Sequence, residues 1–371
     1  MIEILIEGMT NNNGGKETYI VNIFDVFDKS KFHFSFIAYD EKIAYEDHLI
    51  ESGASVIHIA PRYKGIAKFR SNLNDVFNSF KYDVLWAHKT TLSSCEIVEI
   101  AKRHKVPVRM IHSHSSSNMG GILTMILHSI NKWSIRNWAN VYLACSTDAA
   151  KWFYGKKDCR IVKNGINVER FRFNGATRER IRKELGIEND FVIGHVGRFS
   201  AEKNHRKLIN VFYEIHKTKP ETKLILCGDG EERNQIENQI HNLKLNDSII
   251  LLGVIDNVDE VMQALDAFVM PSLFEGLPFA LLEAQASGLN CIVSDTVNRD
   301  ADIIPGNKFI SLDSEDSIWA NSILSIDSNL DRNNAADVIR NNGFDIINCS
   351  KEIQLIIDSG LKDNITNKGA Y

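Results

Sequence analysis

Short apolar segments alternate with longer amphipathic segments along most of this sequence, and this alternation constrains the fold more than any other feature. Helices are predicted between successive apolar segments. The alternation is typical of an α/β fold, here two doubly wound parallel sheets with helices on both faces. Ligands in such sheets bind beyond the carboxyl ends of the strands. We predict strands at residues 3–8, 34–39, 55–60, 83–87, 108–112 and 141–146, and again at 191–196, 223–227, 249–252, 267–270 and 290–294.

A polar, mostly charged stretch at residues 172–190 separates the two series of predicted strands. This stretch suits a linker and a short helix, and 371 residues are enough for two domains. The tail at 344–361 is amphipathic, so we expect a final helix there. The predicted division is a first domain at residues 1–168, a second at 169–344 and a C-terminal helix at 345–371.

Composition excludes several classes of protein. No run of about 18 apolar residues occurs, so we predict no membrane span. The N-terminal MIEILIEGMT has no basic segment before its apolar stretch, so we predict no secretory signal. The six cysteines are scattered without a C-x-x-C pair, which disfavours zinc and disulfide frameworks and suits reduced thiols in the cytoplasm.

Charge is distributed unevenly along the chain. Residues 62–163 contain 17 Lys and Arg against 6 Asp and Glu, although the whole chain carries a net charge of −5. A basic first half favours an anionic acceptor or an anionic membrane surface, and localisation at the inner face of the cell membrane would follow. A solvated basic face without a partner explains the same counts. No nucleic-acid partner is expected.

Two carboxylates stand out in the stretch 270–288, MPSLFEGLPFALLEAQASG. Glu275 lies in a predicted loop, whereas Glu283 lies one to two turns into an apolar helix that Pro278 is expected to begin. Burying a lone carboxylate is costly, so we expect Glu283 to have a hydrogen-bonding or cationic partner. Two acceptors placed in this way could hold two hydroxyl-rich parts of one ligand. The alternative is a helix-end carboxylate and a solvated one.

The Glu275-x7-Glu283 spacing, with Pro271-Ser before it and Gly276-Leu277-Pro within it, resembles the signature of glycosyltransferase family 4. The family consists of retaining enzymes with the GT-B architecture, two Rossmann-like domains that face each other across a cleft. The resemblance covers about residues 3–300 and is closest to bacterial enzymes that build capsule or exopolysaccharide repeats on a lipid carrier. It implies a hexosyltransferase that moves a hexose or N-acetylhexosamine from a UDP-sugar to an acceptor hydroxyl. The acceptor that it implies is a glycan or a lipid-linked glycan.

Glycine-rich turns follow two of the predicted strands, those at 3–8 and 223–227. Glycines there let the backbone approach a phosphate, although tight-turn chemistry explains them equally well. The sequence GGKE at 14–17 resembles the family's Gly-Gly-x-Glu, and the Gly-x-Gly at 228–230 resembles a turn that the family places near the nucleotide. The glycines concerned are Gly14, Gly15, Gly228 and Gly230.

Two cations follow the strand at 191–196. Arg198 offers a planar fork of donors and Lys203 a point charge, and both suit a diphosphate. The segment resembles the family's Gly-Arg…Glu-Lys, in which these cations hold the pyrophosphate. Two solvated loop charges are the alternative interpretation.

Two histidines lie at the end of the predicted strand at 108–112: His112 is its last residue, and His114 lies two positions beyond it. Metal binding at this pair is possible, but no nearby carboxylate or cysteine completes a site. The family places one histidine here, near the donor sugar, and His114 matches it better because it lies further past the strand. A hydrogen-bonded structural histidine is the alternative.

The Asp-x-Asp clamp of metal-dependent sugar transferases is not evident at a strand end. We therefore expect neither a metal nor a cofactor, with Arg198 and Lys203 neutralising the leaving diphosphate. The resemblance also implies that Glu275 accepts from donor-sugar hydroxyls, Glu283 from the ribose, and His114 contacts an outer sugar hydroxyl.

The stretch at 123–138 mixes aliphatic and Trp residues with cations. Such a segment forms either an interfacial helix beside a lipid-linked acceptor or a helix packed on its own sheet with its cations outward, and we favour the second. Two other functions stay open for the whole chain. One is a phosphorylase or epimerase of the same architecture, and the other a catalytically silent subunit that binds nucleotide sugars.

Overall fold

The computed structural model describes residues 1–366 apart from 13, 118–119, 276–277 and 327–330, and the chain forms two compact units. The first unit contains Met1–Gly165 and Ile346–Tyr371, and the second contains Ile166–Asp345. The predicted boundaries lie a few residues away, at 168 and 344. Ile166 N–H donates to Phe344 O at 2.9 Å, and this contact draws both connecting segments into the second unit.

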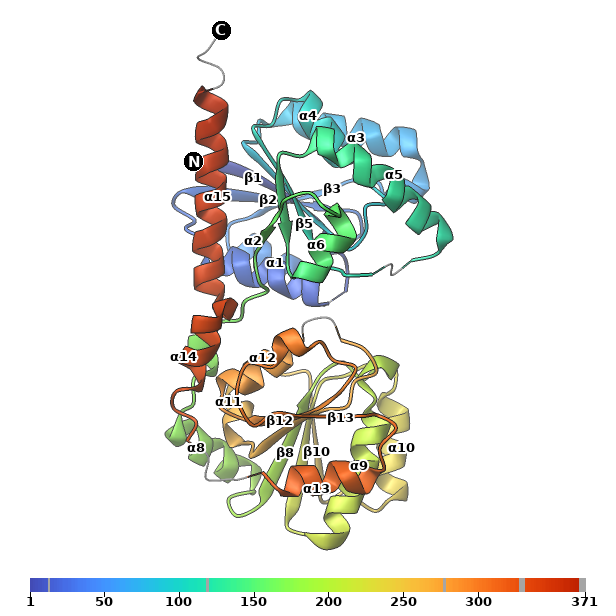
Figure 1. Ribbon diagram of the computed structural model, residues 1–371, viewed down its shortest axis with the longest axis vertical. Coiled ribbons are helices and arrows are strands. Elements are labelled where there is room, and N and C mark those ends of the chain that lie inside the picture. Colours follow the sequence, from blue (N-terminus) through green and yellow to red (C-terminus); the bar gives the residue numbers. More distant parts are fainter. Residues whose placement is uncertain (13, 118–119, 276–277, 327–330, 367–371) are drawn as a thin grey trace. The chain divides into compact units, whose positions relative to one another are not determined.

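Seven parallel strands form the sheet of the first unit, in the order β3-β2-β1-β4-β5-β6-β7 (Figure 1). The order reverses between β1 and β4, which is the switch point where doubly wound folds bind ligands. The strands are β1 (Ile2–Glu7), β2 (Phe32–Ala38), β3 (Ser55–His58), β4 (Val84–Lys89), β5 (Val108–Ser113), β6 (Val141–Ala144) and β7 (Arg160–Ile161). The helices are α1 (Gly15–Val26), α2 (Glu46–Glu51), α3 (Ile66–Ser79), α4 (Glu96–Arg103), α5 (Ile122–Trp138), α6 (Thr147–Tyr154) and α15 (Ile346–Thr366).

The long helix α15, red in Figure 1, belongs to the first unit although it ends the chain. Lys31 Nζ lies 2.7 Å from an Asp358 carboxylate oxygen, and a Cβ on Gly360 would lie 3.0 Å from Val108. The small residue lets the helix approach β5 closely, so the helix packs directly on the sheet.

Six parallel strands form the second sheet, in the order β10-β9-β8-β11-β12-β13, with its switch point between β8 and β11. The two-sheet α/β prediction is therefore confirmed, and the elements that it lacked are α6, α7, α13, α14, β7 and β13. The strands are β8 (Phe191–Val196), β9 (Thr222–Cys227), β10 (Ile249–Gly253), β11 (Ala267–Met270), β12 (Asn290–Ser294) and β13 (Lys308–Ile310). The helices are α7 (Val168–Phe171), α8 (Gly175–Leu185), α9 (His205–Thr218), α10 (Arg233–Asn242), α11 (Val258–Ala264), α12 (Phe279–Ala286), α13 (Asp316–Leu324) and α14 (Ala335–Ile339).

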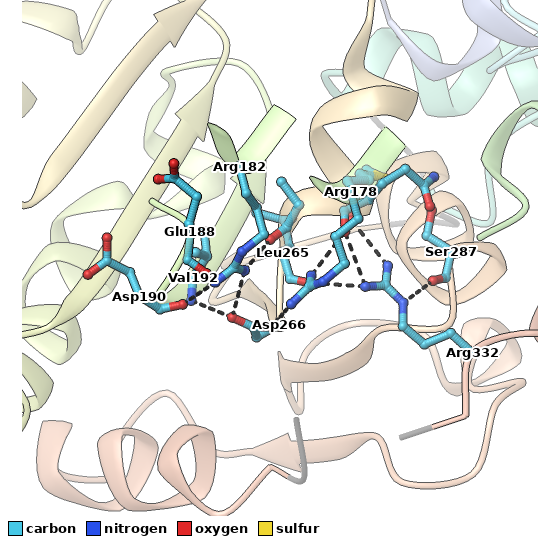
Figure 2. A network of polar contacts seen from close by, with 12 residues as sticks. Arg178, Arg182, Glu188, Asp190, Val192, Leu265, Asp266, Ser287 and Arg332 are labelled. Carbon is cyan, nitrogen blue, oxygen red and sulfur yellow. Dashed lines mark hydrogen bonds and ion pairs between the residues drawn. The ribbon is translucent and has the colours of Figure 1, made fainter. Parts of the chain in front are cut away.

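Arg178, Arg182 and Arg332 converge at the amino ends of β8 and β11 (Figure 2). Asp266 is the carboxylate that pairs with Arg178 and Arg182 there, and it also accepts from Val192 N–H at 2.7 Å. Burial, together with the neighbouring arginines, lowers the pKa of Arg332 to about 9. Helix carbonyl ends carry partial negative charge, so they balance the excess of cations. The other acceptors include the carbonyls of Ala264, Leu265 and Ser287. This network secures the edge of the sheet opposite the candidate site.

Candidate functional site

The carboxyl edge of the second sheet brings Lys203 and Glu275 together. The Lys203 ammonium pairs with the Glu275 carboxylate, which also accepts from Ser272 Oγ at 2.9 Å. Their side chains are 22% and 12% exposed. Two residues predicted separately, 72 positions apart, therefore form one half-buried ion pair. An ion pair that is poorly solvated and still reachable is suited to bind a charged, hydroxyl-rich ligand.

Backbone contacts between two loops position this pair. Lys203 ends the 3-10 turn Ala201–Lys203, and Leu273 N–H donates to Glu202 O at 2.7 Å. Asn204 follows with a φ of 54° and donates from its side chain to Pro271 O at 3.2 Å. The loop after β8 is thus joined to the loop after β11, and these strands neighbour each other at the switch point.

Gly228 and Gly230 serve loop packing. Gly228 has a φ of +140°, and a Cβ on it would lie 2.0 Å from Gly197 O. A Cβ on Gly230 would lie 2.5 Å from Phe199 O. Phe199 N–H donates to Asp229 O at 2.9 Å, so the loops after β8 and β9 run against each other. The glycines are required for that approach, which is the tight-turn interpretation of this motif.

Arg198 lies in the same loop as Lys203 but faces a different partner. Its guanidinium is 3.1 Å from a Glu231 carboxylate oxygen, and both side chains are more than half exposed. The structure thus separates the two predicted cations, with Lys203 half-buried on Glu275 and Arg198 in solvent.

Glu283 projects from α12, which begins at Phe279 with Pro278 as its N-cap, one residue later than predicted. The expected partner of Glu283 is not found: its carboxylate makes no hydrogen bond or ion pair to any residue that the structure describes. Burial raises the pKa of Glu283 to about 7, partly offset by Arg170. Arg170 itself pairs with Asp259 at 2.8 Å, which is why it is not available to Glu283. The predicted site residues Gly276 and Leu277 lie outside the described residues.

In the first unit, Gly14 and Gly15 form the start of α1. Gly14 is the N-cap residue and its carbonyl accepts from Thr18 N–H at 2.9 Å. Glu17 is buried, accepts from Thr10 Oγ1 at 2.7 Å and lies 3.2 Å from Lys16 Nζ. Glu17 therefore holds the preceding loop, whereas the glycines leave the N–H groups of the first helical turn without a side-chain cap.

Three histidines, not two, meet at the carboxyl edge of the first sheet. His112 is the last residue but one of β5, His114 directly follows the strand, and His88 lies beside His112 in the register of β4 and β5. His88 Nδ1 and His114 Nε2 are 2.9 Å apart. Burial lowers the pKa of His112 to about 3 and holds those of the other two well below the usual value. His88 could have been found from the sequence, because it directly follows the predicted strand at 83–87, the strand that precedes the one with the histidine pair.

A buried ion pair lies at the same edge. Lys89 Nζ is 2.8 Å from Glu7 Oε1, and both residues are less than a tenth exposed. Burial acts to lower the pKa of Lys89, but the Glu7 carboxylate together with Cys95 and Glu96 outweighs it, and the pKa is raised. Tyr39 also donates to Glu7, at 3.3 Å. A polar cavity of about 620 Å³ lies nearby, lined by Asn11, Tyr39, Asp40, Glu41, Lys42, Ile43, Tyr63 and Lys64.

Helix α5 contradicts our favoured interpretation of 123–138. Its buried residues are His128 and Ile135, whereas six large apolar side chains are exposed, from 44% for Met125 to 75% for Ile122. Arg136 lies over the Trp133 ring at 4.8 Å. The helix thus presents an apolar face with a cation at its C-terminal end, which suits the interfacial alternative. The exposed set is Ile122, Leu123, Met125, Ile126, Ile130 and Trp133, called here the α5 face. No helix in the described ranges has the length and hydropathy to cross a bilayer.

Two doubly wound parallel-sheet units in one chain are the fold of GT-B glycosyltransferases. Solved structures of such enzymes match this chain over nearly its whole length. Anabaena HepE in complex with UDP matches with a TM-score of 0.77 at 18% identity, over 97% of this chain and 100% of that one. A glycosyltransferase from Rickettsia africae matches with a TM-score of 0.78 at 15% identity, over 97% and 99%.

Sequence comparisons place the chain more narrowly. The profile described as Glycosyltransferase Family 4 matches residues 13–170, and Glycosyl transferases group 1 matches 177–342. "Putative glycosyltransferase EpsF" of Bacillus subtilis is 32% identical over 332 residues, 86% of this chain and 85% of that protein. The chain therefore belongs to glycosyltransferase family 4. An Escherichia coli relative, "UDP-Gal:alpha-D-GlcNAc-diphosphoundecaprenol alpha-1,3-galactosyltransferase", is 32% identical over 222 residues, 56% of this chain and 55% of its own length.

Proposed function

We propose that this protein transfers a hexose or N-acetylhexosamine from a UDP-sugar to an acceptor hydroxyl with retention of configuration. The observation that carries the proposal is the half-buried Lys203–Glu275 pair at the switch point of the second sheet. The HepE structure is a complex with UDP, and the name of the Escherichia coli relative includes UDP-Gal. Those names support UDP as the nucleotide here.

Lys203 acts on the leaving diphosphate, where negative charge develops as the bond between the anomeric carbon and the phosphate oxygen breaks. A fixed cation in a poorly solvated site stabilises such charge strongly. Arg198, in the same loop, turns from Glu231 to the diphosphate when the donor binds. Gly228 and Gly230 hold the loop that supports both cations.

Glu275 and Glu283 divide the work on the rest of the donor. Glu275 accepts from the sugar hydroxyls and steadies positive charge at the anomeric carbon. Glu283 accepts from the ribose hydroxyls. Its carboxylate has no partner among the described residues and a pKa of about 7, which suits a group that gains its partner from the ligand. Gly276 and Leu277, between them in the motif, are assigned to the same donor contacts.

The residues of the first unit retain the roles that the family resemblance implies. Gly14 and Gly15 present backbone N–H groups to the phosphates, and His114 contacts an outer hydroxyl of the sugar. The acceptor oxygen attacks from the side on which the diphosphate leaves, and a phosphate oxygen takes the acceptor proton. This front-face return needs neither a covalent nucleophile nor a metal.

The α5 face favours an acceptor carried on a lipid in capsule or exopolysaccharide synthesis. Exposed contiguous apolar surface is unusual on a protein that works alone in water. Arg136 at the end of the helix adds a cation for anionic headgroups. We assign the first unit to the acceptor and the second to the nucleotide sugar, with the protein acting at the cytoplasmic membrane face.

Incubation with UDP-glucose, UDP-galactose and their N-acetylhexosamine counterparts, with and without EDTA, tests the proposal. Release of UDP that depends on an acceptor and survives EDTA is the expected result. Binding of a UDP-sugar without turnover under every acceptor condition would indicate the silent nucleotide-sugar-binding subunit instead. Complete loss of UDP release with EDTA, with release restored by manganese, would contradict the metal-independent mechanism. Absorbance from a pyridoxal phosphate lysine would indicate a phosphorylase.

A further inference from the structure

The histidine cluster of the first unit has more bonding capacity than the fold uses. Four of the six ring nitrogens of His88, His112 and His114 are buried and find no hydrogen-bond partner in the described part of the chain. They are His88 Nε2, His114 Nδ1 and both nitrogens of His112. A buried polar atom left unpaired costs about 1–3 kcal/mol. His112 is the clearest case, because neither of its nitrogens is paired, whereas the facing nitrogens of the other two rings, His88 Nδ1 and His114 Nε2, are joined to each other at 2.9 Å.

The cluster is held rigidly by the sheet. His88 and His112 are direct partners in the parallel register of β4 and β5, and His114 N–H donates to Lys89 O at 2.9 Å. Tyr19 packs edge-on against the His112 ring at a centroid distance of 5.3 Å. Because the sheet fixes the backbone of these residues, an ion that binds the rings requires only side-chain adjustments.

The chemistry of the rings suits a transition metal. Neutral imidazole is the commonest protein ligand of such ions. His88 Nδ1 and His114 Nε2 share a hydrogen bond, so one of them carries a proton, and this proton must move to the outer nitrogen of its ring when an ion binds between them.

The spacing of the nitrogens approaches that of a tetrahedral ion. One ligand nitrogen from each ring lies within 4.8 Å of the others, and His88 Nδ1 and His114 Nε2 are 2.9 Å apart. Zinc–nitrogen bonds of about 2.0–2.1 Å place tetrahedral ligands roughly 3.3 Å apart. Small side-chain rotations therefore convert the observed cluster into a coordination sphere.

We propose that His88, His112 and His114 bind one zinc ion, with its fourth position open to water or to an exogenous ligand. Three imidazoles with one open position are a common donor set for zinc outside purely structural sites. A search for short ligand spacings in the sequence misses this site, because its histidines come from two neighbouring strands and are up to 26 positions apart.

The test is metal binding by the full-length chain after removal of metals with a chelator. We expect one zinc ion per chain by elemental analysis and titration calorimetry, and a tetrahedral visible spectrum with cobalt as the probe. His112→Gln should weaken zinc binding by more than about 100-fold, since even an outer partner of a ligand is worth about 10–100-fold. His241→Gln, at an exposed histidine of the second unit, is the matched control and should retain the site.

Two results would overturn the site. One is failure of the wild-type chain to bind zinc or cobalt, a measurement that needs no variant to fold. The other is equal zinc affinity in His112→Gln and in the wild type, which would place the ion elsewhere, for example on cysteine. Circular dichroism of His112→Gln confirms that lost binding is not lost folding, and His88→Gln provides a second variant.

One consequence rests on the proposed function. If His114 contacts the donor sugar, zinc on its ring competes with the donor, so zinc inhibits transfer and a chelator restores it. Zinc binding without inhibition would support the metal site and contradict the role of His114. Inhibition that persists in His112→Gln would instead contradict the site. Because zinc binding is measured without any donor, the metal site and the transferase proposal can fail separately.

Discussion

The carboxyl edges of the two sheets have a similar topology but differ in how far their charged groups are buried. In the first unit, the polar groups are mostly buried: Glu7 and Lys89 pair with each other, and His88 and His112 are buried beside the partly buried His114. In the second unit, the charges are on loops that solvent reaches, with Lys203 half-buried and Arg198 mostly exposed. A doubly wound fold thus supplies the location of a site, and the loops decide whether charge is used to build the edge or to bind a ligand.

The largest effect is expected where charge builds the first edge. Lys89→Met leaves the Glu7 carboxylate buried without its cation, so the free energy of unfolding should fall by about 3–5 kcal/mol. Lys151→Met is the matched control, because Lys151 is mostly exposed and its pair with Asp148 contributes at most about 1 kcal/mol. Denaturant unfolding measures both. Similar midpoints for the two variants would contradict the structural role of the Glu7–Lys89 pair.

In the second unit, the corresponding loss should be of activity and not of stability. Lys203→Ala and Arg198→Ala should each lower kcat/KM by roughly 10²–10³-fold, because each removes a donor from the leaving diphosphate. The fold should survive, since both residues lie in a polar loop. Lys217→Ala, a half-exposed cation paired with Glu214 on α9, is the control. Near-wild-type kinetics for Lys203→Ala would mean that it does not contact the diphosphate.

The two carboxylates of the second edge should fail in different ways. Glu275→Gln retains shape but loses charge, so kcat should fall by about 10–100-fold with little change in donor affinity. Glu283→Gln should weaken the binding of UDP and of the UDP-sugar alike, by about tenfold. Calorimetry with UDP and steady-state kinetics on both variants separate these outcomes. Equal weakening of UDP by both would remove the division of roles, and no effect from either would remove the motif interpretation.

Proton linkage sharpens the assignment of Glu283. Its pKa is about 7 without ligand, and ribose hydroxyls favour the ionised carboxylate, so donor affinity should rise about tenfold between pH 6 and pH 8. The ligand-free fold behaves oppositely. Between pH 4.5, the ordinary pKa of a glutamate, and pH 7, Glu283 binds more protons in the folded chain than in the unfolded chain. Its contribution to the free energy of unfolding therefore falls as pH rises through this range.

UDP-glucose is the ligand for this titration, because its diphosphate does not change charge in that range. Glu283→Gln should show a flat profile over the same pH values. An unchanged profile in Glu283→Gln would assign the titration to another group.

The smallest effect concerns the surface of the first unit. Wild-type protein should sediment with anionic vesicles at low salt and be released by salt. Arg136→Ser, beside the α5 face, should weaken binding by about 1 kcal/mol, roughly fivefold. Arg299→Ser in the second unit is the control, since Arg299 also covers an aromatic ring, Phe309, at 3.7 Å. Equal recovery with neutral and anionic vesicles would leave a solvated basic face.

Local patterns determined much of this protein. The alternation of apolar segments predicted both parallel sheets, because buried strands and amphipathic helices differ in period. The motif residues Arg198, Lys203, Glu275 and Glu283 could be selected from their chemistry and spacing. Short or late elements such as β13 and α14 were missed, because three to five residues carry too little periodicity.

Tertiary structure decided what those residues touch. The pairing of Lys203 with Glu275, the lack of a partner for Glu283 among the described residues, and the meeting of His88 with His112 all depend on which strands are neighbours. The α5 face depends on which side of a helix the sheet covers. Sequence patterns report period and residue type, whereas burial and pairing arise from contacts between distant segments, so only the assembled fold determines them.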